Sequence, residues 1–251
     1  MIDGHPLVWL GVCGACLAAA LTIESPTMLA ILAAGLLCTG LLARGPRVAS
    51  FVAACIATLG VAAWWLLCLA ALPGPEGGPV LLRLPSASLG VGAQFGGAVT
   101  LAAVDRCVQH QLVAAVVLLS LGLAGQLVSV RGWRSLAALT GPLAPAFGWL
   151  AAGGEAAAEV AAARRQRRGS PGPSTLVTWL RACRDLSRDL PGVSPRVLLQ
   201  WRLGDLWQAI ATVALLAAVI WAGGAGVLGM TVAATLLPVS VTVSGLRRHH
   251  A

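Results

Sequence analysis

Apolar residues dominate six separate stretches of this chain, and each stretch is long enough to form a helix that crosses a lipid bilayer. The stretches hold 17 to 25 residues without a charged side chain, and they are Leu7–Ile23, Thr27–Ala43, Val48–Leu72, Leu112–Val130, Leu206–Ala222 and Ala225–Val243. A bilayer core about 30 Å thick needs roughly 20 apolar residues per helix. Continuous apolar runs without alternating polar positions favour helices over strands. The pattern predicts an all-α fold, a polytopic membrane helix bundle of about six spans.

A segment dense in arginine separates the fourth apolar stretch from the fifth. Residues 131–202 hold 11 of the 17 basic residues, and every basic residue of the chain is an arginine. Thr140-Gly141-Pro142 is typical of a helix start, so we expect a helix from there to about Arg168, ended by Gly169. Apolar residues recur every three to four positions in Thr175–Leu190 and predict a second amphipathic helix.

Three regions follow from these patterns. Residues 1–134 are expected to form the N-terminal membrane helices, residues 135–204 a basic region at the cytoplasmic face or membrane interface, and residues 205–251 a C-terminal membrane hairpin with its tail. Arginine-rich loops stay on the cytoplasmic side of membranes. Arg44, Arg47, the basic region and the tail residues Arg247 and Arg248 all fit one such arrangement. We therefore expect a multi-pass protein of the cell (plasma) membrane with cytoplasmic N- and C-termini.

Residues 80–111 allow three interpretations: a seventh span, a re-entrant segment or an outer interfacial helix. Gly92 and Gly96 form a GxxxG pattern, which lets membrane helices approach closely. A seventh span would place Arg131 and Arg134 on the wrong side of the membrane. A tilted or non-spanning segment is therefore favoured.

Few residues suggest chemistry of their own. The absence of lysine excludes a Walker-type phosphate-binding loop within this chain. Cys13 and Cys16 form a CxxC inside an apolar stretch, where small-residue packing is favoured over redox or metal use. His110 and Asp105 are read as an interfacial polar cluster rather than as metal ligands. Asp205 is read as one half of a helix-start ion pair with Arg202. We predict no enzyme activity, no cofactor and no metal site.

The basic region requires a partner of opposite charge. One interpretation is contact with anionic lipid headgroups of the bilayer, and the other is docking in an acidic groove of a soluble protein. Two ordered helices exceed what topology alone needs, which favours the soluble protein. A membrane enzyme is a third possibility with little motif support. No nucleic-acid-binding module is recognisable, so nucleic acid is not an expected partner.

Several stretches together resemble the transmembrane T component of energy-coupling factor (ECF) transporters, including the cobalt-permease Q-subunit branch. They cover most of the chain and are His5-Pro6-Leu7-Val8, Glu24-Ser25-Pro26, Leu89 to Arg106, Glu155–Gly169, Arg181 to Gly192, and Pro195-Arg196 with Leu199 to Asp205. The two short coupling motifs depart from the family pattern. Arg167-Arg168-Gly169 has Arg where Ala is usual, and Ser187-Arg188-Asp189 lacks its glycine, which is displaced to Gly192.

The resemblance implies a coupling scaffold rather than an enzyme. In that family two coupling helices lie in grooves of two ABC ATPase subunits, while the membrane part holds a substrate-binding S component that carries a vitamin or metal ion. By position, Arg168 and Arg188 are expected to contact the ATPases, with Arg165, Gly169 and Arg184 in support. Guanidinium groups suit such contacts because they stay charged and bind carboxylates in a bidentate manner.

Overall fold

The computed structural model describes residues 5–43, 48–71, 79–85, 87–89, 93–128, 132–133, 203–221 and 224–246. Most of these residues are helical. The helices of the described part are α1 (Pro6–Thr22), α2 (Pro26–Leu42), α3 (Val48–Ala71), α4 (Leu101–Leu127), α8 (Leu203–Ile220) and α9 (Gly224–Leu246). The prediction of a mostly helical fold is therefore confirmed, although the all-α class is not, because four short strands are also present. Each predicted apolar stretch lies largely within one helix.

Two of these helices are long and apolar enough to cross a membrane. The first is the Ser50–Leu69 part of α3, with a mean hydropathy of 2.2, and the second is α4, with a mean hydropathy of 1.8. The other four helices contain shorter apolar stretches. This composition is compatible with a membrane protein.

Local sequence explains where the helices begin. Pro6 and Pro26 are the first residues of α1 and α2, where proline fits because the first helical N–H has no partner within the helix. Thr100 precedes α4, and its hydroxyl oxygen accepts a hydrogen bond from the Ala103 N–H at 3.3 Å. This cap fixes the start of α4 at Leu101, eleven residues before the predicted position at Leu112. The extra residues include Asp105 and Arg106, whose charges hid the helix from a search for apolar runs.

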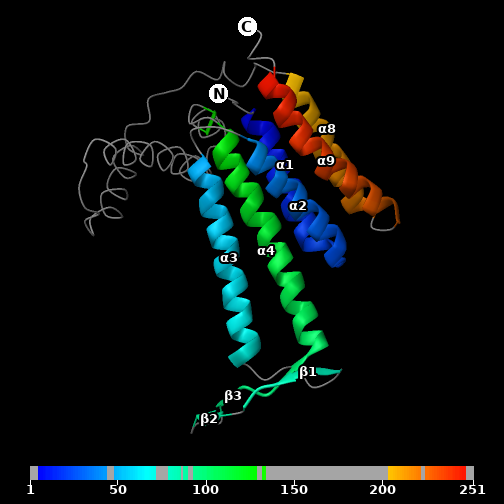
Figure 1. Ribbon diagram of the computed structural model, residues 1–251. Coiled ribbons are helices and arrows are strands. Elements are labelled where there is room, and N and C mark those ends of the chain that lie inside the picture. The colour runs from blue at the N-terminus through cyan, green and yellow to red at the C-terminus, as the bar shows by residue number, and fades with distance from the viewer. Residues whose placement is uncertain are drawn as a thin grey trace, which may run out of the picture.

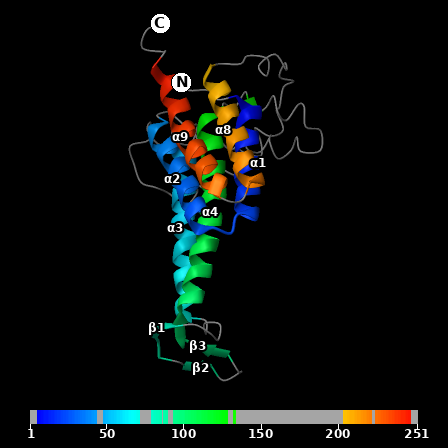
Figure 2. The same ribbon diagram turned by 90° about the vertical axis from the view of Figure 1, so that its right-hand side faces the viewer.

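Five of the helices form a closed ring around a common core, which we call the five-helix ring. Around it α1 packs on α8, α8 on α9, α9 on α2, α2 on α4 and α4 on α1. Figures 1 and 2 show these helices side by side, with α3 outside them against α4. The ring brings the first and last described helices together, so distant parts of the sequence build a single core.

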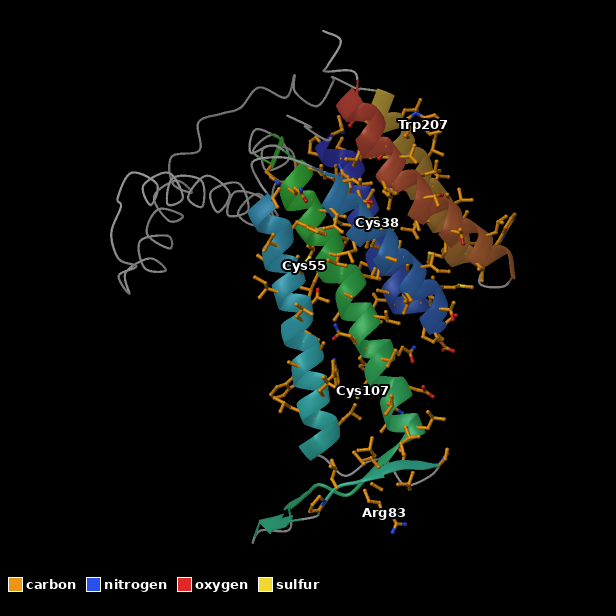
Figure 3. The ribbon with its side chains drawn as sticks, viewed as in Figure 1. Cys38, Cys55, Arg83, Cys107 and Trp207 are labelled. Atoms are coloured by element: carbon orange, nitrogen blue, oxygen red, sulfur yellow. The ribbon has the colours of Figure 1, made fainter. Side chains whose placement is uncertain are left out.

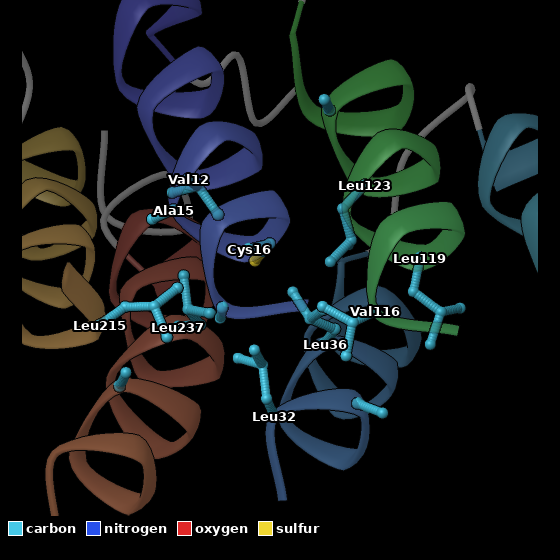
Figure 4. Packing of buried hydrophobic residues seen from close by; sticks show 14 of the residues in the cluster. Val12, Ala15, Cys16, Leu32, Leu36, Val116, Leu119, Leu123, Leu215 and Leu237 are labelled. Carbon is cyan, nitrogen blue, oxygen red and sulfur yellow. The ribbon is translucent and has the colours of Figure 1, made fainter. Parts of the chain in front are cut away.

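The core inside the ring is apolar and closely packed (Figure 4). Trp9, Leu32, Leu36, Leu215 and Leu237 are among the side chains with almost no exposed surface. Their burial removes a large apolar area from the surroundings of the molecule, and dispersion contacts add to its stability.

Glycines allow the closest helix contacts. A Cβ atom at Gly35 of α2 would lie 2.7 Å from the Cβ and 2.8 Å from the carbonyl oxygen of Ala234 in α9. Pro238 has no N–H, so the Ala234 carbonyl lacks its usual helical donor four residues later. A Cβ at Gly122 of α4 would lie 2.4 Å from the Cβ of Ala54 in α3. Small residues at these crossings let the backbones approach.

The outer half of α4 (residues 101–114) and α3 extend beyond the ring and carry a β-ribbon at their tip (Figure 1). The ribbon contains β1 (Val80–Arg83), β2 (Ala87–Leu89), β3 (Ala93–Phe95) and β4 (Ala98–Thr100). Antiparallel pairs join β1 to β4, with Val80 opposite Thr100, and β2 to β3, with Ala87 opposite Phe95. We call α3, the outer half of α4 and this ribbon the arm.

The ribbon excludes the two helical interpretations for the first part of residues 80–111, and α4 contains the rest. This first part is neither a seventh span nor an outer helix, because strands occupy the described residues up to Thr100. The predicted GxxxG helix contact is also wrong for Gly96. Gly96 and Gly97 have φ values of 83° and 127° and form the connection between β3 and β4. Glycine favours this left-handed conformation because it lacks a Cβ.

Candidate functional site

The predicted docking residues Arg165, Arg168, Gly169, Arg184 and Arg188 lie outside the described residues. Their assignment stays a prediction. The structure does describe both places where the chain enters and leaves the basic region, and these two attachment points define the candidate site.

Both attachment points lie at one end of the molecule. The end of α4 and the start of α8 flank the basic region. The start of α1, the end of α2, the start of α3 and the end of α9 lie at the same end (Figure 1). In the sequence, Arg44, Arg47, Arg247 and Arg248 follow or precede these helix ends. Of the seventeen basic residues, Arg83 lies in the ribbon and Arg106 in the outer half of α4, both toward the opposite end of the molecule.

The chain enters the basic region from the core. Leu127, Val128 and Trp133 are buried members of the central apolar cluster. Gln126 is also buried, and its side-chain N–H donates a hydrogen bond to the Ala43 carbonyl at the end of α2. The end of α4 is therefore held by both apolar packing and a polar link to α2.

The chain leaves the basic region into a buried polar junction. Asp205, in the first turn of α8, is only 4% exposed, and its Oδ1 accepts a hydrogen bond from the His5 backbone N–H at 3.0 Å. His5 is the N-cap residue of α1, and its side chain is also buried. One turn further inside, Trp9 of α1 and Gln208 of α8 are buried. This hydrogen bond joins the starts of two helices 200 residues apart in the sequence.

The junction gives Asp205 a partner that the sequence did not suggest. The predicted ion pair with Arg202 stays a prediction, because Arg202 lies outside the described part. The structure shows that the carboxylate accepts a hydrogen bond from the N-cap residue of another helix, where a negative charge also suits the positive end of the α1 dipole. The sequence signal was present, because Asp205 is an acidic residue at the start of a long apolar run. Nothing in a single sequence identified His5 as its partner.

The other candidate residues do not assemble a second site in the described part of the chain. The His110 ring packs edge-on against Trp65, with ring centroids 5.1 Å apart, and its Nδ1 lies 2.7 Å from the Arg106 carbonyl oxygen. No group of three or more potential metal ligands occurs among the described residues. The Cys13 thiol donates to the Ser120 carbonyl at 3.4 Å, and Cys16 is fully buried in the core. These contacts are those of packed helices.

Compared with protein-family models, curated proteins and solved structures, the chain shows no match. The function must therefore be argued from the site itself. Its main feature is that a basic region of about seventy residues is joined at both ends to one apolar core.

Proposed function

We propose that this protein is the transmembrane coupling scaffold of an ECF-type ABC importer. In this role the basic region docks on two ABC ATPase subunits, and the membrane helices hold an S component that binds a vitamin or a metal ion. The protein itself performs no catalysis. The observation that carries the proposal is the attachment of the arginine-rich region, at both its ends, to the core of an apolar helix bundle.

A membrane setting is supported by the exposed surface of the helices. Ile56, Leu59, Trp64, Leu66 and Leu67 on α3 are each more than half exposed in the isolated chain. Large contiguous apolar surfaces are unfavourable in water and mark contact with lipid or with another protein. Threonine hydroxyls in several helices donate to the carbonyl four residues earlier, as in Thr58 to Ala54 and Thr212 to Gln208. These bonds satisfy the hydroxyls without water.

The arrangement of helix ends supports six spans with cytoplasmic termini. All helix ends that are flanked by arginine-rich sequence lie together, as the positive-inside rule requires. The four shorter helices of 17 to 23 residues would be about 26–35 Å long. The shortest of these can span if the bilayer thins locally around them.

Attachment at both ends explains how movement of the ATPases would reach the membrane part. A force on the basic region acts on α4 through the packed residues Leu127 and Trp133, and on α8 through Asp205. Because Asp205 also binds His5, α1 moves with α8. The apolar face of α3 offers the S component a lateral surface within the bilayer.

A detergent pull-down of the tagged protein with mass spectrometry of its partners tests the proposal. The wild type is expected to retain stoichiometric ABC ATPases, and Arg168→Glu combined with Arg188→Glu is expected to lose them. Reversing a charge leaves a carboxylate facing the acidic groove. Loss of one partner of a desolvated charge pair weakens binding by about 2–5 kcal/mol.

The matched control is Arg247→Glu combined with Arg248→Glu, which makes the same change in net charge in the tail. ATPases lost from both double variants would indicate a general charge effect. A protein that purifies alone but binds anionic liposomes in a salt-sensitive manner would instead identify the basic region as a lipid-binding element.

A further inference from the structure

The two helices of the arm meet along a regular seam. On α3 the buried and half-buried positions recur every three to four residues, and they are 50, 51, 54, 55, 58, 61, 62, 65, 68 and 69. On α4 the facing positions follow the same spacing. This periodicity is that of two antiparallel helices packed side by side. The side chains at these positions therefore meet in pairs along the seam.

Observed contacts fix the register of the pairs. Gly125 faces Ser50, Gly122 faces Ala54, and His110 packs against Trp65. From the first pair to the second, α3 advances by four residues and α4 goes back by three. From the second pair to the third, α3 advances by eleven residues and α4 goes back by twelve. Cys68 follows Trp65 by three residues, and Cys107 precedes His110 by three residues. The next pair of the seam is thus Cys68 with Cys107.

The state of the two thiols agrees with this register. Both are free and partly buried, as side chains in the seam should be. Cys107 lies near the outer end of α4 in Figure 3. Asp105 and Arg106, the two residues before it, are exposed and charged. A charged pair at this level indicates that this turn of α4 contacts water, so soluble reagents can reach the thiols.

We propose that Cys68 and Cys107 form a reversible disulfide that locks the outer end of the arm. The inference goes beyond the proposed function but rests on its orientation, which places this end of the molecule outside the cytoplasm, where disulfides persist. A small-molecule disulfide serves as the oxidant. One cysteine thiolate attacks it, and one thiol leaves as a mixed disulfide forms. The other cysteine then displaces the second thiol, so two protein thiols lose their hydrogens and the oxidant is reduced to two thiols.

The closed bond would fix the spacing of α3 and α4 at the level where they extend beyond the other helices of the ring (Figure 1). Disulfide formation requires the two Cα atoms to come within about 4.4–6.8 Å. The outer end of the arm can adjust to this requirement, because α3 has α4 as its main neighbour in the described part of the chain. Oxidation would thereby restrict the movement of one of the surfaces available to the S component.

Peptide mapping of the full-length wild-type protein, after treatment with dipyridyl disulfide, tests the pairing. The protein is held in detergent, alkylated without reduction and digested. A peptide that links Cys68 to Cys107 is expected, together with loss of alkylation at both positions and recovery of alkylation after reduction. Cys38, which is exposed on α2, should be alkylated or carry a single pyridylthio group, without a link to another cysteine.

Treatment of right-side-out membrane vesicles with a membrane-impermeant disulfide then tests the sidedness. Formation of the same linked peptide is expected there, and its absence in right-side-out vesicles but presence in inverted ones would overturn the lock as well as the orientation. Separate mixed disulfides on Cys68 and Cys107 in detergent, without a linked peptide, would overturn the pairing while leaving the ATPase pull-down unaffected. Cys68→Ser and Cys107→Ser must each abolish the linked peptide.

Discussion

The five-helix ring and the arm are built from similarly apolar sequence but are held together differently. In the ring each helix touches two or more others, and buried side chains fill the centre. In the arm α3 rests mainly on one neighbour, and only 6% of its apolar stretch is buried within the molecule, against 39% for α4. Hydropathy alone does not distinguish these two environments.

The difference separates two uses of apolar residues. Inside the ring they fill a core, and their shapes must fit those of their neighbours. On the arm they face outward, and their role is to suit an apolar surrounding. A change of polarity should therefore be most damaging on the arm, and a change of volume should be most damaging in the ring.

A charge in the middle of the arm is expected to give the largest effect. Leu59 is 69% exposed and lies at the centre of the Ser50–Leu69 stretch. If this surface faces lipid, Leu59→Arg should reduce insertion by about 2.5–3.5 kcal/mol, the cost of an arginine at the centre of a membrane helix. Glycosylation-tagged insertion assays measure this cost.

The matched control is Leu81→Arg in the ribbon. Leu81 is also well exposed, at 57%, but lies beyond the ends of both long helices. Insertion of this variant should remain close to that of the wild type. Normal insertion of Leu59→Arg as well would show that the exposed face of α3 contacts water and not lipid.

The sequence was sufficient to locate the helices but not their contacts. Uninterrupted apolar runs between prolines and charges placed α1, α2, α3, α8 and α9 within a few residues of their observed bounds. The start of α4 was missed because Asp105 and Arg106 interrupt the apolar run. The ribbon was missed because its strands of three and four residues are too short to show an alternating pattern.

The polar junction was beyond sequence reasoning for a different reason. Asp205 and His5 are each noticeable at the start of a helix, but their hydrogen bond depends on α1 and α8 being neighbours in the ring. Periodicity identifies a face of a helix and not the helix that covers it. The docking arginines rest on the family resemblance, so they remain predictions.

A larger side chain at a ring crossing is the next prediction. Gly35→Val should destabilise the protein by about 1–3 kcal/mol, because the new side chain meets the backbone of Ala234, which cannot rotate away. Gly60→Ala on the arm is the control, since a Cβ at this position would have no atom of another described element within 4 Å. The control should be neutral or slightly stabilising by helix propensity. Thermal unfolding in detergent measures the stability of both variants. Equal losses of stability in the two variants would contradict the distinction between ring and arm.

Removing the carboxylate at the junction should have a comparable or smaller effect. Asp205→Ala leaves the buried His5 N–H without this acceptor, at a cost of about 1–3 kcal/mol. Asp205→Asn keeps an oxygen at the same place and should lose less. Asp105→Asn is the control because Asp105 is exposed. If both Asp205 variants unfold at the wild-type temperature, the junction does not join α1 to α8.

The smallest effect is expected within the seam of the arm. The Gln111 side-chain N–H donates to the Thr58 carbonyl at 2.9 Å, while its Oε1 is buried without a hydrogen-bond partner among the described residues. Gln111→Leu loses one hydrogen bond, worth about 0.5–1.5 kcal/mol, but also removes an unsatisfied acceptor that costs about as much. The free energy of unfolding should therefore change by less than about 1 kcal/mol, in either direction. A loss of several kcal/mol would mean that this single polar link, rather than apolar packing along the seam, holds α3 to the ring.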